Sequence, residues 1–188
     1  MSLVDNLSSL FNAATVILVG AAVLTSPKAH ALGDLTLDGV TKDYVENTGE
    51  TTVLNSHIKT IRVIGELKLN NTHSEYVHEV GELIGVNSTV TKLDATGDIH
   101  LLKSEVGLID TATMIVDLQS TTVKGDVIIN RKWDKFFTSL SFSPKKIKPT
   151  LVHLNGSRIE GTLNCVTACV IESNNSYIAQ VEGNTNSQ

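Results

Sequence analysis

Residues 33–48 read GDLTLDGVTKDYVENT, and four further blocks of sixteen residues follow without a gap: GETTVLNSHIKTIRVI (49–64), GELKLNNTHSEYVHEV (65–80), GELIGVNSTVTKLDAT (81–96) and GDIHLLKSEVGLIDTA (97–112). Every block opens with glycine followed by an acidic residue. Self-similarity at a fixed period of this length is typical of solenoids, in which each repeat buries its apolar face against its neighbours.

The apolar positions of each block fall in pairs, at positions three and five, eight and ten, and thirteen and fifteen. Each pair has the period-two spacing of a strand with one buried face. Three short strands per turn with a corner between each make a triangular coil. The glycine is expected at the sharpest corner, where a positive φ or a close backbone approach is needed. A helix is excluded by the glycine in every block and by the period of two.

The eighth position carries small hydroxyl side chains in most blocks, and we expect them at a second corner, where they cap local backbone groups. The column reads Val40, Ser56, Thr72, Ser88, Ser104 and Ser120. The predicted fold is therefore all-β: a single-stranded β-helix, or triangular β-solenoid, with coils of about sixteen residues. A core filled by Val, Ile, Leu and Thr agrees with 41% apolar but only 4% aromatic residues.

The register fails after residue 128. The stretch 129–150 reads INRKWDKFFTSLSFSPKKIKPT, after which short alternation resumes and Gly161 stands at a multiple of sixteen from Gly33. We expect a solenoid domain over 32–183 with an irregular excursion at 129–150, and a flexible tail at 184–188.

The first 31 residues differ from the rest. Residues 6–26 carry no charge, and Ala29-His30-Ala31 offers a cleavage site for an export signal. The sequence predicts a hydrophobic helical segment that is a signal peptide or, as an alternative, a membrane anchor through residues 6–26. The expected location is then the periplasm, the cell surface or the medium. Cys165 and Cys169 are the only cysteines, and export permits a disulfide between them, with two buried thiols as the alternative.

The excursion is the strongest candidate for an interaction site. It holds six of the fifteen basic residues and half of the eight aromatic residues. Basic and aromatic side chains in a loop suit a membrane surface, a glycan or a protein partner, although a capping role against the solenoid would use the same residues. The predicted binding residues are Arg131, Lys132, Trp133, Lys135, Phe136 and Phe137. Nucleic acid is a poor partner for an exported chain with a net charge of −5.

Other polar columns give weaker signals. Asp34, Glu50, Glu66, Glu82 and Asp98 stack on successive coils and either splay into water or bind cations. His57 and His73 share the ninth column, but two ligands do not make a metal site. No motif for catalysis appears, so we expect no enzyme, no cofactor and no metal; a carbohydrate-active enzyme is the least favoured alternative.

The recurring G-[DE]-[LI] step and the closing NGSRIEGTLN resemble short bacterial β-solenoids of the polymer-forming, bactofilin-like kind. The resemblance implies a compact right-handed triangular β-helix that assembles end to end without catalysis. The expected function is that of an exported structural or scaffolding solenoid. Its expected partner is a second copy of itself, in a homo-oligomer formed end to end. The alternative is a cell-envelope binding module that uses residues 129–150.

Overall fold

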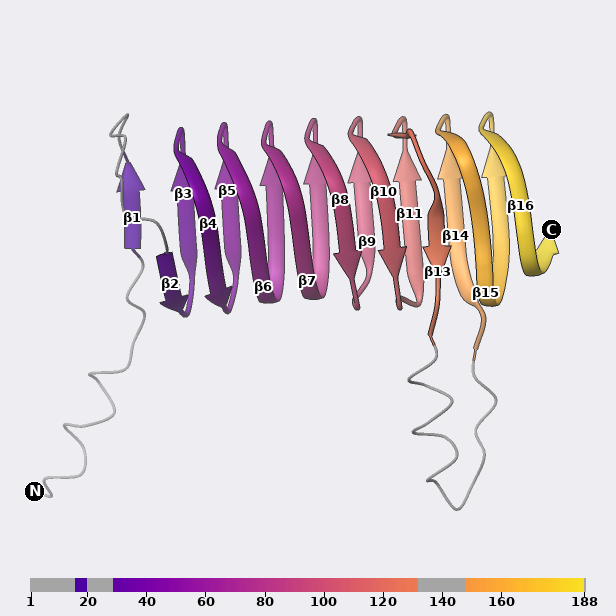
Figure 1. Cartoon of the computed structure of the whole chain (residues 1–188), viewed down its shortest axis with the longest axis horizontal. Coiled ribbons are helices and arrows are strands. Elements are labelled where there is room, and N and C mark those ends of the chain that lie inside the picture. The colour runs from indigo at the N-terminus through magenta and orange to yellow at the C-terminus, as the bar shows by residue number, and fades with distance from the viewer. Residues whose placement is uncertain (1–15, 20–28, 132–147, 188) are drawn as a thin grey trace, which may run out of the picture.

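The computed structural model describes residues 16–19, 29–131 and 148–187. Over these residues the chain is all-β without a helix and forms a β-solenoid of about nine turns. Figure 1 shows the coils stacked in one row along the long axis, with the earliest coils at one end and the C-terminal coil at the other. The prediction of an all-β solenoid is confirmed.

The described residues contribute sixteen strands to one sheet, and every pairing between them is parallel. The strands are β1 (Val16–Val19), β2 (Ala29–Leu32), β3 (Leu35–Asp38), β4 (Thr41–Thr48), β5 (Thr51–Leu54), β6 (His57–Asn70), β7 (His73–Val86), β8 (Thr89–Ala95), β9 (Ile99–Leu102), β10 (Glu105–Thr111), β11 (Ile115–Gln119), β12 (Thr122–Val123), β13 (Val127–Ile129), β14 (Thr150–Asn155), β15 (Arg158–Asn174) and β16 (Tyr177–Ser187).

The strand register follows the sequence blocks at first and then departs from them. Leu35 pairs with Thr51, Thr51 with Leu67, and Leu67 with Leu83, each sixteen positions further along the chain. Later partners in the same column lie farther apart in sequence, because the column runs from Ile99 to Val116, Val152 and Ile171.

The core lies inside the coils and consists mainly of Leu, Ile and Val side chains. Inward and outward residues alternate along each strand, as the burial pattern of β3 and β5 illustrates. One coil shows all three pairs of buried positions, at Thr51 and Val53, Ser56 and Ile58, and Ile61 and Val63. The strands within the stack, from β3 to β15, therefore bury one face, as their spacing predicts.

The glycine that opens each block lies at a corner, and in the first four of the five blocks its backbone conformation is unusual. The φ angles of Gly33, Gly49, Gly65 and Gly81 are 101°, 134°, 139° and 148°. A Cβ on Gly49 would lie 2.5 Å from the carbonyl oxygen of Gly33 in the coil before it. The predicted role of this glycine is confirmed, since both the positive φ and the close approach of stacked backbones exclude a side chain.

The second corner, predicted at the hydroxyl column, uses the left-handed conformation in every coil at the residue directly before that column, a feature that the sequence analysis did not identify. The residues are Gly39, Asn55, Asn71, Asn87, Lys103, Ser120, Gly156 and Asn175, with φ between 47° and 64°. Asparagine and glycine adopt this conformation most readily.

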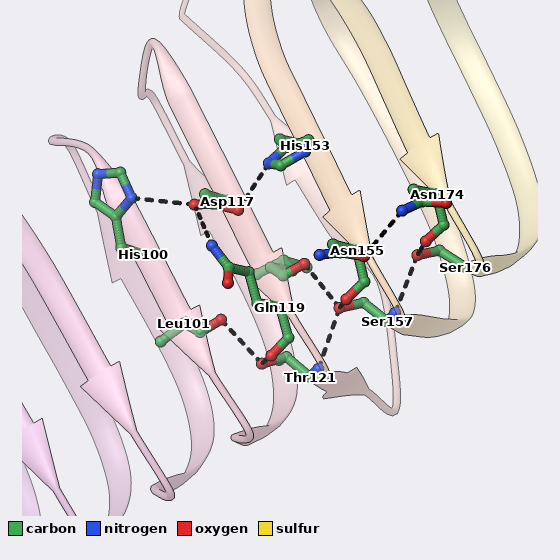
Figure 2. A network of polar contacts seen from close by, with 11 residues as sticks. His100, Leu101, Asp117, Gln119, Thr121, His153, Asn155, Ser157, Asn174 and Ser176 are labelled. Atoms are coloured by element: carbon green, nitrogen blue, oxygen red, sulfur yellow. Dashed lines mark hydrogen bonds and ion pairs between the residues drawn. The ribbon is translucent and has the colours of Figure 1, made fainter.

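The hydroxyl column follows directly after this second corner and forms a ladder of hydrogen bonds. Ser88 is typical: its Oγ accepts a hydrogen bond from the Thr72 amide at 3.2 Å and donates to the Val86 carbonyl at 2.9 Å. Figure 2 shows the C-terminal part, where the Thr121 amide donates to the Ser157 Oγ and the Ser157 amide donates to the Ser176 Oγ. The predicted capping role is confirmed.

Two residues do not occupy the columns assigned to them from spacing. The Ser104 amide donates to Thr121 Oγ1, so Thr121 continues the hydroxyl ladder, while Ser120 takes the left-handed corner. The cause is one additional residue between Ile99 and Val116. Gly161 does not belong to the Gly33 column; it stacks on Gly125, which in turn stacks on Gly107 at another corner.

The predicted N-terminal helix is absent from the part of residues 1–31 that the structure describes, where β1 pairs with β3 and β2 pairs with β4. Among the described residues, no helix has the length and apolarity needed to cross a membrane. The rest of this segment lies outside the described residues. At the other end, β16 continues to Ser187, through most of the stretch for which a flexible tail is predicted.

The break in the repeat is narrower than 129–150. Ile129 ends β13 and pairs with both Thr111 and Cys165, while Thr150 begins β14 and pairs with Cys169. Both side chains are buried. The excursion therefore replaces a single corner, between two positions that belong to the core.

Candidate functional site

Of the six predicted binding residues, the structure describes only Arg131. Lys132, Trp133, Lys135, Phe136 and Phe137 lie outside the described residues. Arg131 is 8% exposed, its Nη1 donates a hydrogen bond to the carbonyl of Lys148 at 2.9 Å, and its amide lies 3.4 Å from Thr167 Oγ1. Arg131 therefore joins the two ends of the excursion and attaches them to the next coil.

A disulfide between Cys165 and Cys169 lies in that next coil, with both side chains fully buried. In β16, Gly183 pairs with Cys165 and Thr185 pairs with Cys169. The two cysteines are four positions apart in sequence but their partners are only two apart, so β15 has two additional residues at this corner. The disulfide closes this widened corner. It encloses Thr167, whose carbonyl oxygen lies 3.5 Å from Cys169 Sγ.

A polar cluster covers three adjacent coils on an outer face (Figure 2). Asp117 lies between two imidazoles: its Oδ1 is 3.0 Å from His153 Nδ1 and its Oδ2 is 3.6 Å from His100 Nδ1. Gln119 Nε2 donates to the same carboxylate at 3.1 Å. The arrangement orients both rings and pairs any imidazolium charge with Asp117. Sequence reasoning missed it because His153 follows Asp117 by 36 residues, across the break in register.

The acidic column lies on successive coils, as predicted, and two of its members share one cation. Lys68 Nζ lies 2.7 Å from Glu50 Oε1 and 2.9 Å from Glu66 Oε1. Hydrogen bonds to these two carboxylates raise the pKa of Lys68 above its ordinary value. Asp98 Oδ1 instead accepts hydrogen bonds from the Thr113 hydroxyl and the Ile115 amide. Lysine and backbone donors thus offset part of the repulsion between stacked carboxylates.

His57 and His73 stack on adjacent coils, with ring centroids 4.8 Å apart and an interplanar angle of 14°. They line an open polar groove of about 320 Å³ that follows the left-handed corner from Gly39 to Asn87. In the part of the chain that the structure describes, no group of three or more His, Cys, Asp or Glu side chains is arranged to hold a metal ion.

Glu79 is a carboxyl group inside the solenoid. It is fully buried at an inward position of β7, and neither of its oxygens has a hydrogen-bond partner. Burial raises the pKa of Glu79 to about 8, with smaller contributions from the carboxylates of Glu82 and Asp98. The group is therefore mainly a neutral acid at pH 7.

The C-terminal coil leaves part of the core column uncovered. Ile178 and Val181 in β16 pair with Ile159 and Leu163 in β15, which are both fully buried. Val181 is 43% exposed because, among the described residues, no strand pairs with the other side of β16. This edge presents unpaired backbone groups together with apolar side chains that continue the core, a combination that favours pairing with another strand.

A second apolar surface follows the last position of the sequence blocks. It comprises Leu32, Thr48, Ile64 and Val80, which pair in that order on successive coils, and we call it the Leu32–Val80 stripe. Leu32, Ile64 and Val80 are 85%, 58% and 40% exposed. Such aligned apolar side chains are uncommon on an isolated surface and are typical of interaction sites.

No protein-family model, curated protein or solved structure matches this chain. The candidate surfaces are therefore judged on geometry alone. The C-terminal edge and the Leu32–Val80 stripe both expose side chains of the kind that a partner buries, and neither was singled out from the sequence. The exposed members of the stripe occupy the last position of successive sixteen-residue blocks, so the repeat alignment contained the information needed to predict the stripe.

Proposed function

We propose that this chain is a structural β-solenoid that associates with copies of itself through its C-terminal coil. The observation that carries the proposal is the uncovered core column of β16. A further coil stacked on β16 buries Ile178 and Val181 and pairs the free backbone groups of the edge.

The energetic argument rests on the way a solenoid is stabilised. Each coil gains most of its stability from the interface with its neighbours, so a terminal coil is covered on one side only. Burial of apolar side chains such as Val181 contributes about 25 cal/mol per Å² of area removed from water. A second copy is a suitable partner because its parallel coils have the same strand spacing, of about 4.8 Å.

We further propose that the assembly lies outside the cytoplasm, with residues 1–31 serving as an export signal or as an anchor. The A-x-A pattern at residues 29–31 and the disulfide between Cys165 and Cys169 support this location. The likeness of the repeat to polymer-forming solenoids concerns the sequence pattern only. It does not extend to this location, because those proteins are cytoplasmic or bound to the inner membrane face. Intact-mass measurement of the secreted chain checks cleavage, which is expected before Leu32.

Sedimentation velocity over a hundredfold range of concentration tests self-association. The wild-type chain is expected to form species larger than a monomer as the concentration rises, and Val181→Lys is expected to abolish them because the ammonium cannot be buried in a core column. Val166→Lys is the matched control, since Val166 is also an exposed valine, 37% accessible, but lies in β15, one coil before the edge strand. A wild-type chain that stays monomeric at every concentration contradicts the proposal.

The alternative function, a binding module that uses residues 129–150, remains a prediction. The described part of this region shows Arg131 bonded to Lys148, so both ends of the excursion leave the solenoid at one place. Such a base suits the presentation of a segment to a partner, because it fixes where the segment begins and ends.

A further inference from the structure

The Leu32–Val80 stripe is accompanied by hollows in the surface. One hollow of about 150 Å³ is lined by residues from Glu46 to Val80, and another of about 420 Å³ lies at its Leu32 end. Both are lined by Glu46 and Thr48, so they lie next to each other along the stripe. The stripe therefore offers shallow pockets for side chains along several coils, beyond the exposed residues themselves.

The stripe is bordered by acidic side chains. Across the glycine corner lies the acidic column of Asp34, Glu50, Glu66 and Glu82, and on the other side lie Glu46, Arg62 and His78. Carboxylates outnumber the basic groups on these borders, although Lys68 neutralises part of the column. A partner that fits this surface has apolar side chains for the stripe and basic side chains for its borders.

The chain itself carries a segment with this chemistry. Residues 132–147 read KWDKFFTSLSFSPKKI and combine one tryptophan and three phenylalanines with four lysines and one aspartate. Aromatic side chains are the commonest anchors at protein interfaces, and lysines beside them meet the acidic borders. The charge of the segment is thus complementary to that of the stripe.

The segment on the same chain cannot lie along the whole stripe. Its ends belong to the coil of β13, and β2, which ends at Leu32, lies six strand pairings away, or about 29 Å at the spacing of parallel strands. Sixteen residues tethered at both ends reach about 26–29 Å when fully extended. Val80 and Ile64 lie three and four strand pairings away and within this reach, but the tip would barely reach Leu32, so only the segment of another copy can cover the whole stripe.

We propose that the Leu32–Val80 stripe binds the basic-aromatic segment 132–147 of a second copy of this chain. This contact is lateral and uses a different surface from the C-terminal edge. It therefore does not depend on the end-on association proposed above.

The test is the binding of a fluorescein-labelled synthetic peptide of residues 131–148 to the full chain, followed by fluorescence anisotropy. The wild-type chain is expected to bind the peptide saturably, and the double variant Ile64→Lys/Val80→Lys to bind it at least tenfold more weakly. A peptide with Trp133, Phe136 and Phe137 changed to Ser is expected to lose affinity to the same extent. Circular dichroism shows whether the double variant, which alters only exposed side chains, keeps its fold.

Two control variants make the result specific. Leu102→Lys changes an exposed leucine, 38% accessible, outside the stripe and is expected to leave peptide affinity unchanged. Val181→Lys removes end-on association and is also expected to leave peptide affinity unchanged, so the two proposals fail separately. Absence of saturable binding, or equal binding by the double variant, overturns the inference.

The source of the segment is checked with a full chain in which Trp133, Phe136 and Phe137 are changed to Ser. If each chain covered its own stripe, this variant would bind the wild-type peptide more tightly than the dilute wild-type chain does, which would overturn the assignment to a second copy. Equal affinities are expected, because a dilute wild-type chain then has a free stripe.

Discussion

The guanidinium of Arg131 donates a hydrogen bond to the carbonyl of Lys148 at 2.9 Å and so closes the excursion at its base. The two residues are seventeen positions apart in sequence but belong to one corner of one coil. The solenoid therefore continues past the excursion with its core columns intact, from Ile129 to Cys165 and from Val152 to Ile171.

Loss of this bond is expected to destabilise the C-terminal coils. Arg131→Ala removes a buried, charged donor and leaves the Lys148 carbonyl without it, which costs about 1.5–3 kcal/mol in the free energy of unfolding. Urea denaturation followed by far-UV circular dichroism measures the change. Lys124→Ala, which alters an exposed lysine, is the control and is expected to cost less than about 0.5 kcal/mol. Equal midpoints for the two variants would contradict the role of Arg131.

Glu79 is expected to make the solenoid less stable as the pH rises. Its pKa is raised from 4.5 to about 8 in the folded chain, so the folded state holds a proton that the unfolded state has released over this range. The stabilisation is complete below about pH 4.5 and is lost as the pH rises to about 8, at about 1.4 kcal/mol per pH unit. Above that range the buried carboxylate is charged and has no hydrogen-bond partner.

The Glu79→Gln variant is expected to remove this dependence, because the amide does not titrate. Melting temperatures measured from pH 5 to pH 9 should fall steadily for the wild type and change much less for the variant. Glu75→Gln, at an exposed position that does not contribute to the pKa of Glu79, should follow the wild type. Parallel curves for wild type and Glu79→Gln would show that Glu79 titrates normally.

The disulfide is expected to contribute about 2 kcal/mol, the value for a closed loop of this length in the chain-entropy account. The double variant Cys165→Ser/Cys169→Ser should unfold at a lower urea concentration than the oxidised wild type. A reducing agent should lower the wild-type midpoint and leave that of the double variant unchanged. A wild-type midpoint that does not respond to reduction would mean that the bond adds no stability.

Ser88→Ala is expected to destabilise the chain by about 1–3 kcal/mol because the buried Thr72 amide loses its acceptor. Ser88→Thr keeps a hydroxyl in the same place, as Thr72 and Thr121 do in their own coils, and should be tolerated. Thermal unfolding of the two variants compares them directly. If alanine were tolerated as well as threonine, the ladder would be incidental to stability.

The sequence was sufficient for the fold because local spacing and stacking agree in the first five blocks. The glycine corner and the hydroxyl column follow from backbone geometry that recurs in each coil. The left-handed corner was also readable, since Asn55, Asn71 and Asn87 recur at the block spacing and asparagine is common in that conformation.

The columns beyond residue 112 could not be read because the coils change length. One additional residue moves Ser120 to the corner and places Thr121 in the ladder. The excursion then makes residue spacing uninformative. Gly161 was therefore assigned to the wrong column. The contact of Asp117 with His153 could not be predicted, because no repeat spacing relates the two residues. The unpaired edge of β16 depends on where strand pairing stops among the described residues, and a repeat pattern does not give that information.

The parallel strand pairing described above determines how the molecule responds to force. Hydrogen bonds between neighbouring coils point along the long axis of the solenoid (Figure 1), and the disulfide joins two residues of one coil. Tension along this axis therefore loads the coil interfaces in series, and coils should peel from an end one at a time at low force. Bending must compress the packed interior on one side, and close-packed interiors resist compression. The solenoid is thus expected to resist bending more strongly than it resists stretching along its long axis.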